Sequence, residues 1–134
     1  IQSFHDKSQG RERGLNTIYI IKMEDIALVH MGDFGQDALS EEQIDRIGDP
    51  DILMVPVGGV YTVNYKEAVE VVRQIGPKII IPMHYRVPGL KVDIGGPEKF
   101  LKEISLTPEK ADKSWKVQKK SLPAEEMKLV LFNA

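Results

Sequence analysis

The stretch Ile26–Gly35 (IALVHMGDFG) constrains the fold more than any other part of the chain. Its apolar run is short and rich in branched residues, which is typical of a strand buried on both faces. The run ends at His30, and a glycine turn then presents Asp33 where a buried strand meets solvent. A carboxylate in that position needs a partner to offset its desolvation, and a metal ion is one such partner.

Strand and helix patterns alternate along the rest of the chain. Capping-box residues Ser40 and Gln43 open one helix, which stops at Gly48, and Asn64 caps a stronger helix, which ends at Gly76-Pro77. We expect strands at 16–22, 26–31, 51–57 and 78–83 and late strands at 115–119 and 127–132. We expect a hairpin turn at 23–25 and helices at 41–47, 65–75 and 97–104. We interpret the polar residues 1–15 as a strand end that runs into a loop, and 105–113 as a polar, exposed segment.

This order of elements predicts a mixed α/β fold, with one sheet flanked by helices. Strands that are apolar on both faces need cover on both faces, and the predicted helices can cover only one. We therefore expect the other face to be exposed, or covered by a missing half of the protein or by another copy of the chain. With 134 residues, the chain is long enough for one domain with a real core.

Composition excludes several classes of function. The formal net charge of -2, without any basic block, argues against broad nucleic-acid binding, and no apolar run is long enough to cross a membrane. The absence of cysteine excludes disulfides and cysteine-based zinc sites, so a cytoplasmic location is the default expectation. The chain begins at Ile1 without a methionine, and we interpret it as part of a longer protein.

The chain has three histidines, and each follows a loop or a strand end: His5, His30 and His84. Neutral imidazole is the commonest metal ligand, and a carboxylate such as Asp33 suits zinc, manganese or iron. For one histidine alone, a core or surface role is the better interpretation. Three in such positions, with Asp33 beside one of them, favour a metal site.

Other polar residues near these histidines have two interpretations each. Asp6 is either a turn residue or part of the site, and Tyr85 either donates a proton or packs. His30 and Asp33 point in different directions across their turn, so we expect His30 to orient a ligand and Asp33 to be the ligand. Arg11 and Arg13 could bind an anionic substrate group, although a solvated loop is the favoured interpretation.

The chain resembles the C-terminal part of metallo-β-lactamase-fold hydrolases. The likeness rests on SFHD, GRERGLNTIYI, HMGDFG, DILMVPVGGVYT and KIIIPMHY, which occur in that order within residues 1–104. It is greatest to a branch of bacterial and archaeal metal-dependent hydrolases related to ascorbate-6-phosphate lactonases. The resemblance implies an αββα sandwich with one or two metal ions, Zn²⁺ or Mn²⁺, at the edge of the two sheets.

The resemblance also implies roles for individual residues. His5 would be the third histidine of the first metal site, Asp33 the bridging carboxylate, and His84 the last histidine, on the second metal. A metal-bound water would attack the small-molecule substrate, an ester, lactone, amide or phosphodiester. The HxHxDH segment of the family is absent from residues 1–134. We expect it upstream of Ile1, and we therefore expect this chain alone to be inactive.

A non-catalytic role is the alternative. In that interpretation the chain is a half-domain that docks on itself or on a partner chain. Nucleotide binding and serine-hydrolase chemistry are weak alternatives, because the chain has no GxGxxG, GxxxxGK[ST] or GxSxG pattern.

Overall fold

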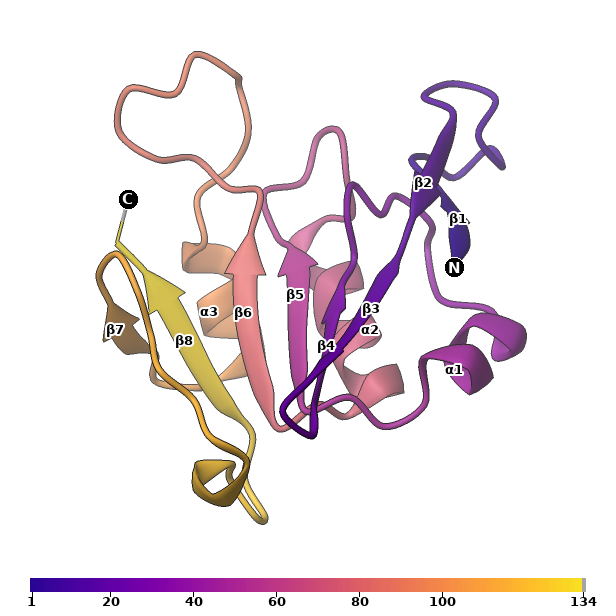
Figure 1. Ribbon diagram of the computed structural model, residues 1–134. Helices are drawn as coiled ribbons and strands as arrows, with labels where there is room; N and C mark the ends of the chain where they lie inside the picture. The colour runs from indigo at the N-terminus through magenta and orange to yellow at the C-terminus, as the bar shows by residue number, and fades with distance from the viewer. Residues whose placement is uncertain (134) are drawn as a thin grey trace.

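A six-stranded sheet forms the centre of the computed structural model, which describes residues 1–133 (Figure 1). The strand order is β3-β4-β5-β6-β8-β7, with β3 antiparallel to β4 and every other neighbouring pair parallel. A separate two-stranded sheet pairs β1 with β2. The strands are β1 (Gln2–Phe4), β2 (Leu15–Thr17), β3 (Tyr19–Met23), β4 (Ile26–His30), β5 (Ile52–Pro56), β6 (Ile79–Met83), β7 (Glu109–Ala111) and β8 (Lys128–Phe132).

Helices α2 (Tyr65–Ile75) and α3 (Glu98–Ile104) lie behind the sheet in Figure 1, and α1 (Glu41–Ile47) lies to the right, beyond the β3 end of the sheet. Their predicted positions are confirmed. Both expected caps form, because the side chain of Ser40 accepts from the N–H of Gln43 and that of Asn64 accepts from the N–H of Glu67. The mixed α/β fold class follows from this arrangement of a sheet with flanking helices.

The face of the sheet beneath the helices holds the main core. Val29, Leu53 and Ile80 on neighbouring strands are all fully buried there. Helix α2 covers them with Ala68, Val69, Val71, Val72 and Ile75, which form one apolar side of the helix.

The opposite face is covered over only part of its width. A second cluster forms around Ile52, Ile79 and Val130, and Trp115 and Val117 pack onto it from the segment after β7. At the other end of the face, the β3 side chains of Tyr19, Ile21 and Met23 stay 57%, 46% and 69% exposed. The expected open face is therefore present at β3, whereas residues of this chain other than helices cover it near β6 and β8.

Three predicted segments differ from the structure in part or in whole. The strand expected at 16–22 is interrupted at Ile18, whose backbone exchanges hydrogen bonds with Ile1, so that β2 and β3 enter different sheets. No ladder forms at 115–119, where a 3-10 helix, η1 (Lys119–Ser121), begins at the last of these residues. Trp115 and Val117 alternate with polar residues, as side chains do in a strand. In the structure, both side chains instead pack against one face of the sheet. The polar segment 105–113 contains β7, in which Glu109 and Ala111 lie opposite Val130 and Phe132 of β8 and Ala111 is buried.

Among residues 1–133, no helix is both long enough and apolar enough to cross a membrane.

Candidate metal centre

Asp33 and His84 meet at the carboxyl edge of the sheet. Asp33 follows β4 and His84 follows β6, and parallel strands bring their carboxyl ends to one edge. The distance from Nε2 of His84 to Oδ1 of Asp33 is 3.8 Å, and their side chains are 29% and 54% exposed. This distance exceeds that of a hydrogen bond but suits two ligands of one ion, since each zinc–ligand bond is about 2 Å.

The backbone of His84 is strained. Its φ is +51°, a left-handed value that residues other than glycine rarely adopt. The carbonyl of His84 accepts a hydrogen bond of 2.9 Å from the N–H of Gly58, and a Cβ at Gly58 would lie within 3.0 Å of that oxygen. The loop after β5 therefore needs glycine here, and it holds His84 in a conformation of the kind that clusters at functional sites.

The turn that carries Asp33 is held by two side chains. Nδ1 of His30 accepts a hydrogen bond of 3.0 Å from the N–H of Gly32. The Oδ1 atom of Asn16 accepts one of 2.9 Å from the N–H of Asp33. His30 is thus placed against the turn, and its role toward a bound metal stays a prediction.

Asn16 was missed by sequence reasoning, which treated it only as the first residue of a strand. The residue is 9% exposed, and its Nδ2 donates hydrogen bonds of 2.8 Å to the hydroxyl of Ser3 and to the carbonyl of Met31. Asparagine is depleted in strands, so an Asn at the start of an apolar run is the signal that could have revealed it.

His5 lies beside the Asp33 turn but faces a different cavity. The N–H of Gly35 donates to the carbonyl of Phe4 at 2.9 Å, and a Cβ at Gly35 would lie within 3.0 Å of the backbone of His5. The segments that carry His5 and Asp33 are therefore in contact. Asp33 and His84 line one hollow of about 500 Å³, whereas His5 lines a neighbouring cavity of about 200 Å³.

The donor set fits a metal in part. Nε2 of His5 is buried without a hydrogen-bond partner within residues 1–133, and so is Nδ1 of His84, although the His84 nitrogen nearest Asp33 is Nε2. Two imidazoles and a carboxylate are ligands that zinc accepts. Over the same residues, no three His, Asp or Glu side chains converge closely enough to hold an ion. Asp33 and His84 form a pair, and the three-residue site with His5 stays a prediction.

Asp6 organises a loop. It is 3% exposed, and its carboxylate accepts from the N–H groups of Ser8, Gly10, Glu12 and Arg13. The hydrogen bond from Arg13 lowers the pKa of Asp6, burial opposes it, and the other three amides add to the lowering. These bonds fit the turn role, and a direct role of Asp6 at a metal stays a prediction.

Tyr85 extends toward β8. Its hydroxyl donates a hydrogen bond of 3.2 Å to the carbonyl of Phe132, and burial raises its pKa. This contact ties the segment after His84 to the end of β8. It fits the packing role, and a proton-donating role of Tyr85 stays a prediction.

Comparison with known proteins gives consistent matches. The family model described as "Beta-lactamase superfamily domain" matches residues 1–84. A UPF0173 metal-dependent hydrolase of Staphylothermus marinus is 41% identical over 73% of this chain and 42% of its own length. Another, of Pyrococcus horikoshii, is 30% identical over 96% of this chain and 53% of its own length.

A crystal structure from the same superfamily has a similar fold. It is that of a Thermotoga maritima protein assigned to the metallo-β-lactamase superfamily as a Zn-dependent hydrolase. The two chains superpose with a TM-score of 0.79 and are 36% identical, over 90% of this chain and 59% of that one. The chain spans about half the length of the curated relatives it matches.

Proposed function

Because this chain belongs to the beta-lactamase superfamily, we propose that it supplies Asp33, His84 and His5 to the metal centre of a metal-dependent hydrolase. The observation that carries the proposal is the approach of Asp33 to His84 at 3.8 Å across two strands that are far apart in sequence. The names of the relatives support the same class of reaction.

The chain's own residues would hold the metal and fix its ligands. Asp33 and His84 would bind it from the ends of β4 and β6, and His5 would bind it from beyond β1. Asn16 and His30 would keep the Asp33 turn in place, as outer partners of metal ligands commonly do. A bound Zn²⁺ or Mn²⁺ would supply Lewis-acid activation of water toward an ester, lactone, amide or phosphodiester.

The described residues supply only part of a metal-ligand set. Asp33 and His84 are the only such pair that residues 1–133 bring together, and no group of three forms there. We therefore propose that residues 1–134 are part of a metallo-β-lactamase domain and are inactive alone. The remaining ligands would come from an HxHxDH segment elsewhere in a longer protein or in a partner chain.

Elemental analysis after dialysis, with calorimetric titration of ZnCl₂ and MnCl₂, tests this proposal. The measurements are made on this chain and on the full-length parent, each with Asp33→Asn, His84→Gln and the control Asp45→Asn. Asp45 is exposed on α1, away from the carboxyl edge. We expect the parent to hold metal and to lose it in the first two variants alone. A parent that binds no divalent metal, or that binds it equally in all variants, contradicts the proposal.

A non-catalytic docking role is the second candidate, and the exposed side chains of Tyr19, Ile21 and Met23 favour it. Sedimentation velocity on the chain and on Ile21→Lys tests docking between copies. If copies pair through this face, the wild-type chain is a dimer and Ile21→Lys is a monomer. A wild-type monomer at every concentration contradicts self-docking.

A further inference from the structure

A cavity of about 200 Å³ lies between the loop after β1 and the turn at 60–62. Two of the residues that line it, His5 and Thr62, carry buried polar atoms, Nε2 and Oγ1, that have no hydrogen-bond partner within residues 1–133. Thr62 is only 9% exposed. Because an unpaired buried hydroxyl costs stability, its retention points to a bound group that completes its hydrogen bonds.

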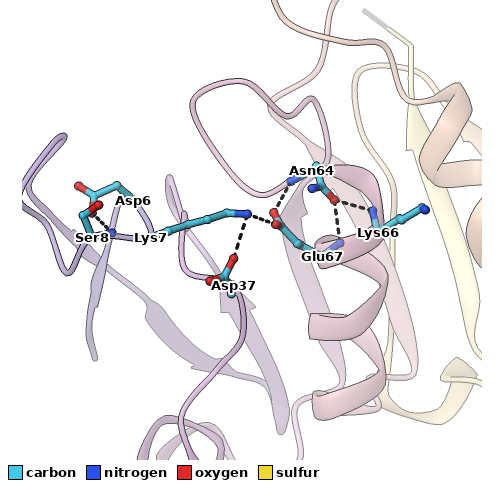
Figure 2. A network of polar contacts seen from close by, with 7 residues as sticks. All are labelled: Asp6, Lys7, Ser8, Asp37, Asn64, Lys66 and Glu67. Atoms are coloured by element: carbon cyan, nitrogen blue, oxygen red, sulfur yellow. Dashed lines mark hydrogen bonds and ion pairs between the residues drawn. The ribbon is translucent and has the colours of Figure 1, made fainter.

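Most charged groups on the wall of this cavity already have partners. Asp6 accepts from four backbone N–H groups. Lys7 pairs with Asp37 at 2.9 Å and with Glu67 of α2, as Figure 2 shows. Glu12 accepts a hydrogen bond of 2.8 Å from the hydroxyl of Ser8.

Arg13 is exposed, and it differs in its pairing from Lys7, the other cation that lines the cavity. Over the described part of the chain it forms no ion pair. Its guanidinium lies 5.6 Å from the centroid of the Tyr61 ring, and its backbone N–H is held by Asp6 at 2.7 Å. An arginine that is positioned in this way and lacks an acidic partner is available to bind an anion.

The turn opposite Arg13 is strained as well. Val60 has a φ of +66°, although β-branched residues strongly avoid left-handed values, and it is 63% exposed. Such strain persists where the surrounding structure enforces it and clusters at ligand-binding segments. The next two residues of this turn are Tyr61, whose ring lies near the Arg13 guanidinium, and Thr62, which lines the cavity.

We propose that this cavity binds an oxyanion group of the substrate, a carboxylate or a phosphate, through Arg13 and Thr62. The inference rests on the proposed function, in which the neighbouring His5 is a metal ligand, and it names the substrate class. A guanidinium donates two parallel hydrogen bonds to an oxyanion, and the threonine hydroxyl donates one more. Sites that enclose a whole ligand measure about 300–1,000 Å³. This cavity therefore holds one group of the substrate.

Binding of inorganic phosphate and of acetate tests the inference. The metal-free chain is titrated with each anion while the ¹H–¹⁵N NMR signals of Thr62 and Arg13 are followed. We expect Arg13→Ala to weaken binding about tenfold or more, the factor that loss of a charge-assisted hydrogen bond gives. Arg11→Ala, in the same loop but outside the cavity wall, is the matched control and should leave affinity within about twofold.

Two variants of Thr62 separate binding from folding. Thr62→Val should weaken anion binding, and Thr62→Ser should retain it. Because the hydroxyl has no partner within residues 1–133, the unfolding midpoint of Thr62→Val should equal or exceed that of the wild type. Equal affinity in the wild type, Arg13→Ala and Thr62→Val overturns the inference, as does a wild-type chain that binds neither anion.

Metal titration of the full-length parent and its Arg13→Ala and Thr62→Val variants distinguishes this inference from the proposed function. We expect the variants to keep metal and lose anion affinity. Metal binding without anion binding in the wild type overturns the inference and leaves the proposed function standing. Anion binding at Arg13 and Thr62 by a parent that holds no metal overturns the proposed function, and the cavity remains an oxyanion site.

Discussion

The side-chain oxygen of Asn16 accepts a hydrogen bond of 2.9 Å from the backbone N–H of Asp33. The same amide donates to Ser3 on β1 and to the carbonyl of Met31 just before the turn. One buried side chain therefore fixes the turn that presents Asp33 and ties it to the small β1–β2 sheet.

Replacement of Asn16 by alanine should destabilise the chain. The N–H of Asp33 and the carbonyl of Met31 would lose their partner in a buried region, so we expect a loss of about 2 kcal/mol in the free energy of unfolding. Urea denaturation followed by circular dichroism measures it. Asn133→Ala, at an exposed site, is the control and should change this free energy by less than about 0.5 kcal/mol. Equal losses in the two variants would contradict the structural role of Asn16.

Gly35→Ala should separate His5 from the Asp33 turn. The new methyl group would lie within 3.0 Å of the backbone of His5, which cannot move aside as a side-chain end can. We expect a loss of about 1–3 kcal/mol in unfolding free energy and weaker metal binding by the parent.

Gly96→Ala is the matched control for that change. At Gly96 the added methyl group would meet only the carboxylate end of Glu98, a flexible side chain that can turn away. Its unfolding free energy should stay close to that of the wild type in the same denaturation experiment. A Gly35→Ala protein as stable as Gly96→Ala would show that this contact does not constrain His5.

Asp51 should make stability depend on acid pH. Burial alone would raise its pKa, but hydrogen bonds from Lys78, the N–H of Ala27 and Lys119 outweigh burial and lower the pKa to about 2. In the unfolded chain the pKa is about 3.9, so the unfolded state binds more protons between these values. The resulting stabilisation, about 2 kcal/mol, is complete above pH 4 and is lost as the pH falls through 2.

Urea denaturation at several values between pH 5 and pH 2 measures this effect in the wild type and in Asp51→Asn. The variant should be less stable than the wild type above pH 4, and the difference should shrink toward pH 2. Asp49→Asn, which changes an exposed neighbour, should follow the wild-type curve. A constant difference between the wild type and Asp51→Asn at every pH would contradict the assignment.

Trp115→Ala should remove packing from the face of the sheet opposite the helices. Trp115 packs onto that face and donates a hydrogen bond of 3.0 Å to Glu109 of β7. Because Trp115 is only half-buried, we expect the free energy of unfolding to fall by about 2 kcal/mol. Replacing a fully buried tryptophan by alanine lowers it by about 3–5 kcal/mol. Thermal unfolding by circular dichroism measures it. Lys116→Ala, exposed beside it, should change the midpoint little, and an unchanged midpoint in Trp115→Ala would contradict this packing role.

Elements with local signals were predictable from sequence. The caps of α1 and α2 involve residues three apart, and the β3–β4 turn contains Glu24 and Asp25, which both adopt the left-handed φ that a short hairpin needs. The meeting of Asp33 and His84 at one edge was expected from the family resemblance, and the parallel pairing of β4, β5 and β6 accounts for it.

Contacts between distant residues were decided only by the tertiary structure. Asn16 hydrogen-bonds to Asp33, which lies 17 residues away in the sequence, and Lys119 hydrogen-bonds to Asp51, which lies 68 residues away. The alternation at Trp115 and Val117 predicted a strand, yet these side chains lie across a sheet face.

The sequence by itself determined which segments become strands and helices around Asp33 and His84, because backbone hydrogen bonding and local apolar patterns act within a few residues. Only the tertiary structure decided that Asn16 holds the Asp33 turn and that His5 and Thr62 share a cavity with Arg13. Packing of distant segments fixes those contacts, and no short stretch of sequence specifies its partner across the fold.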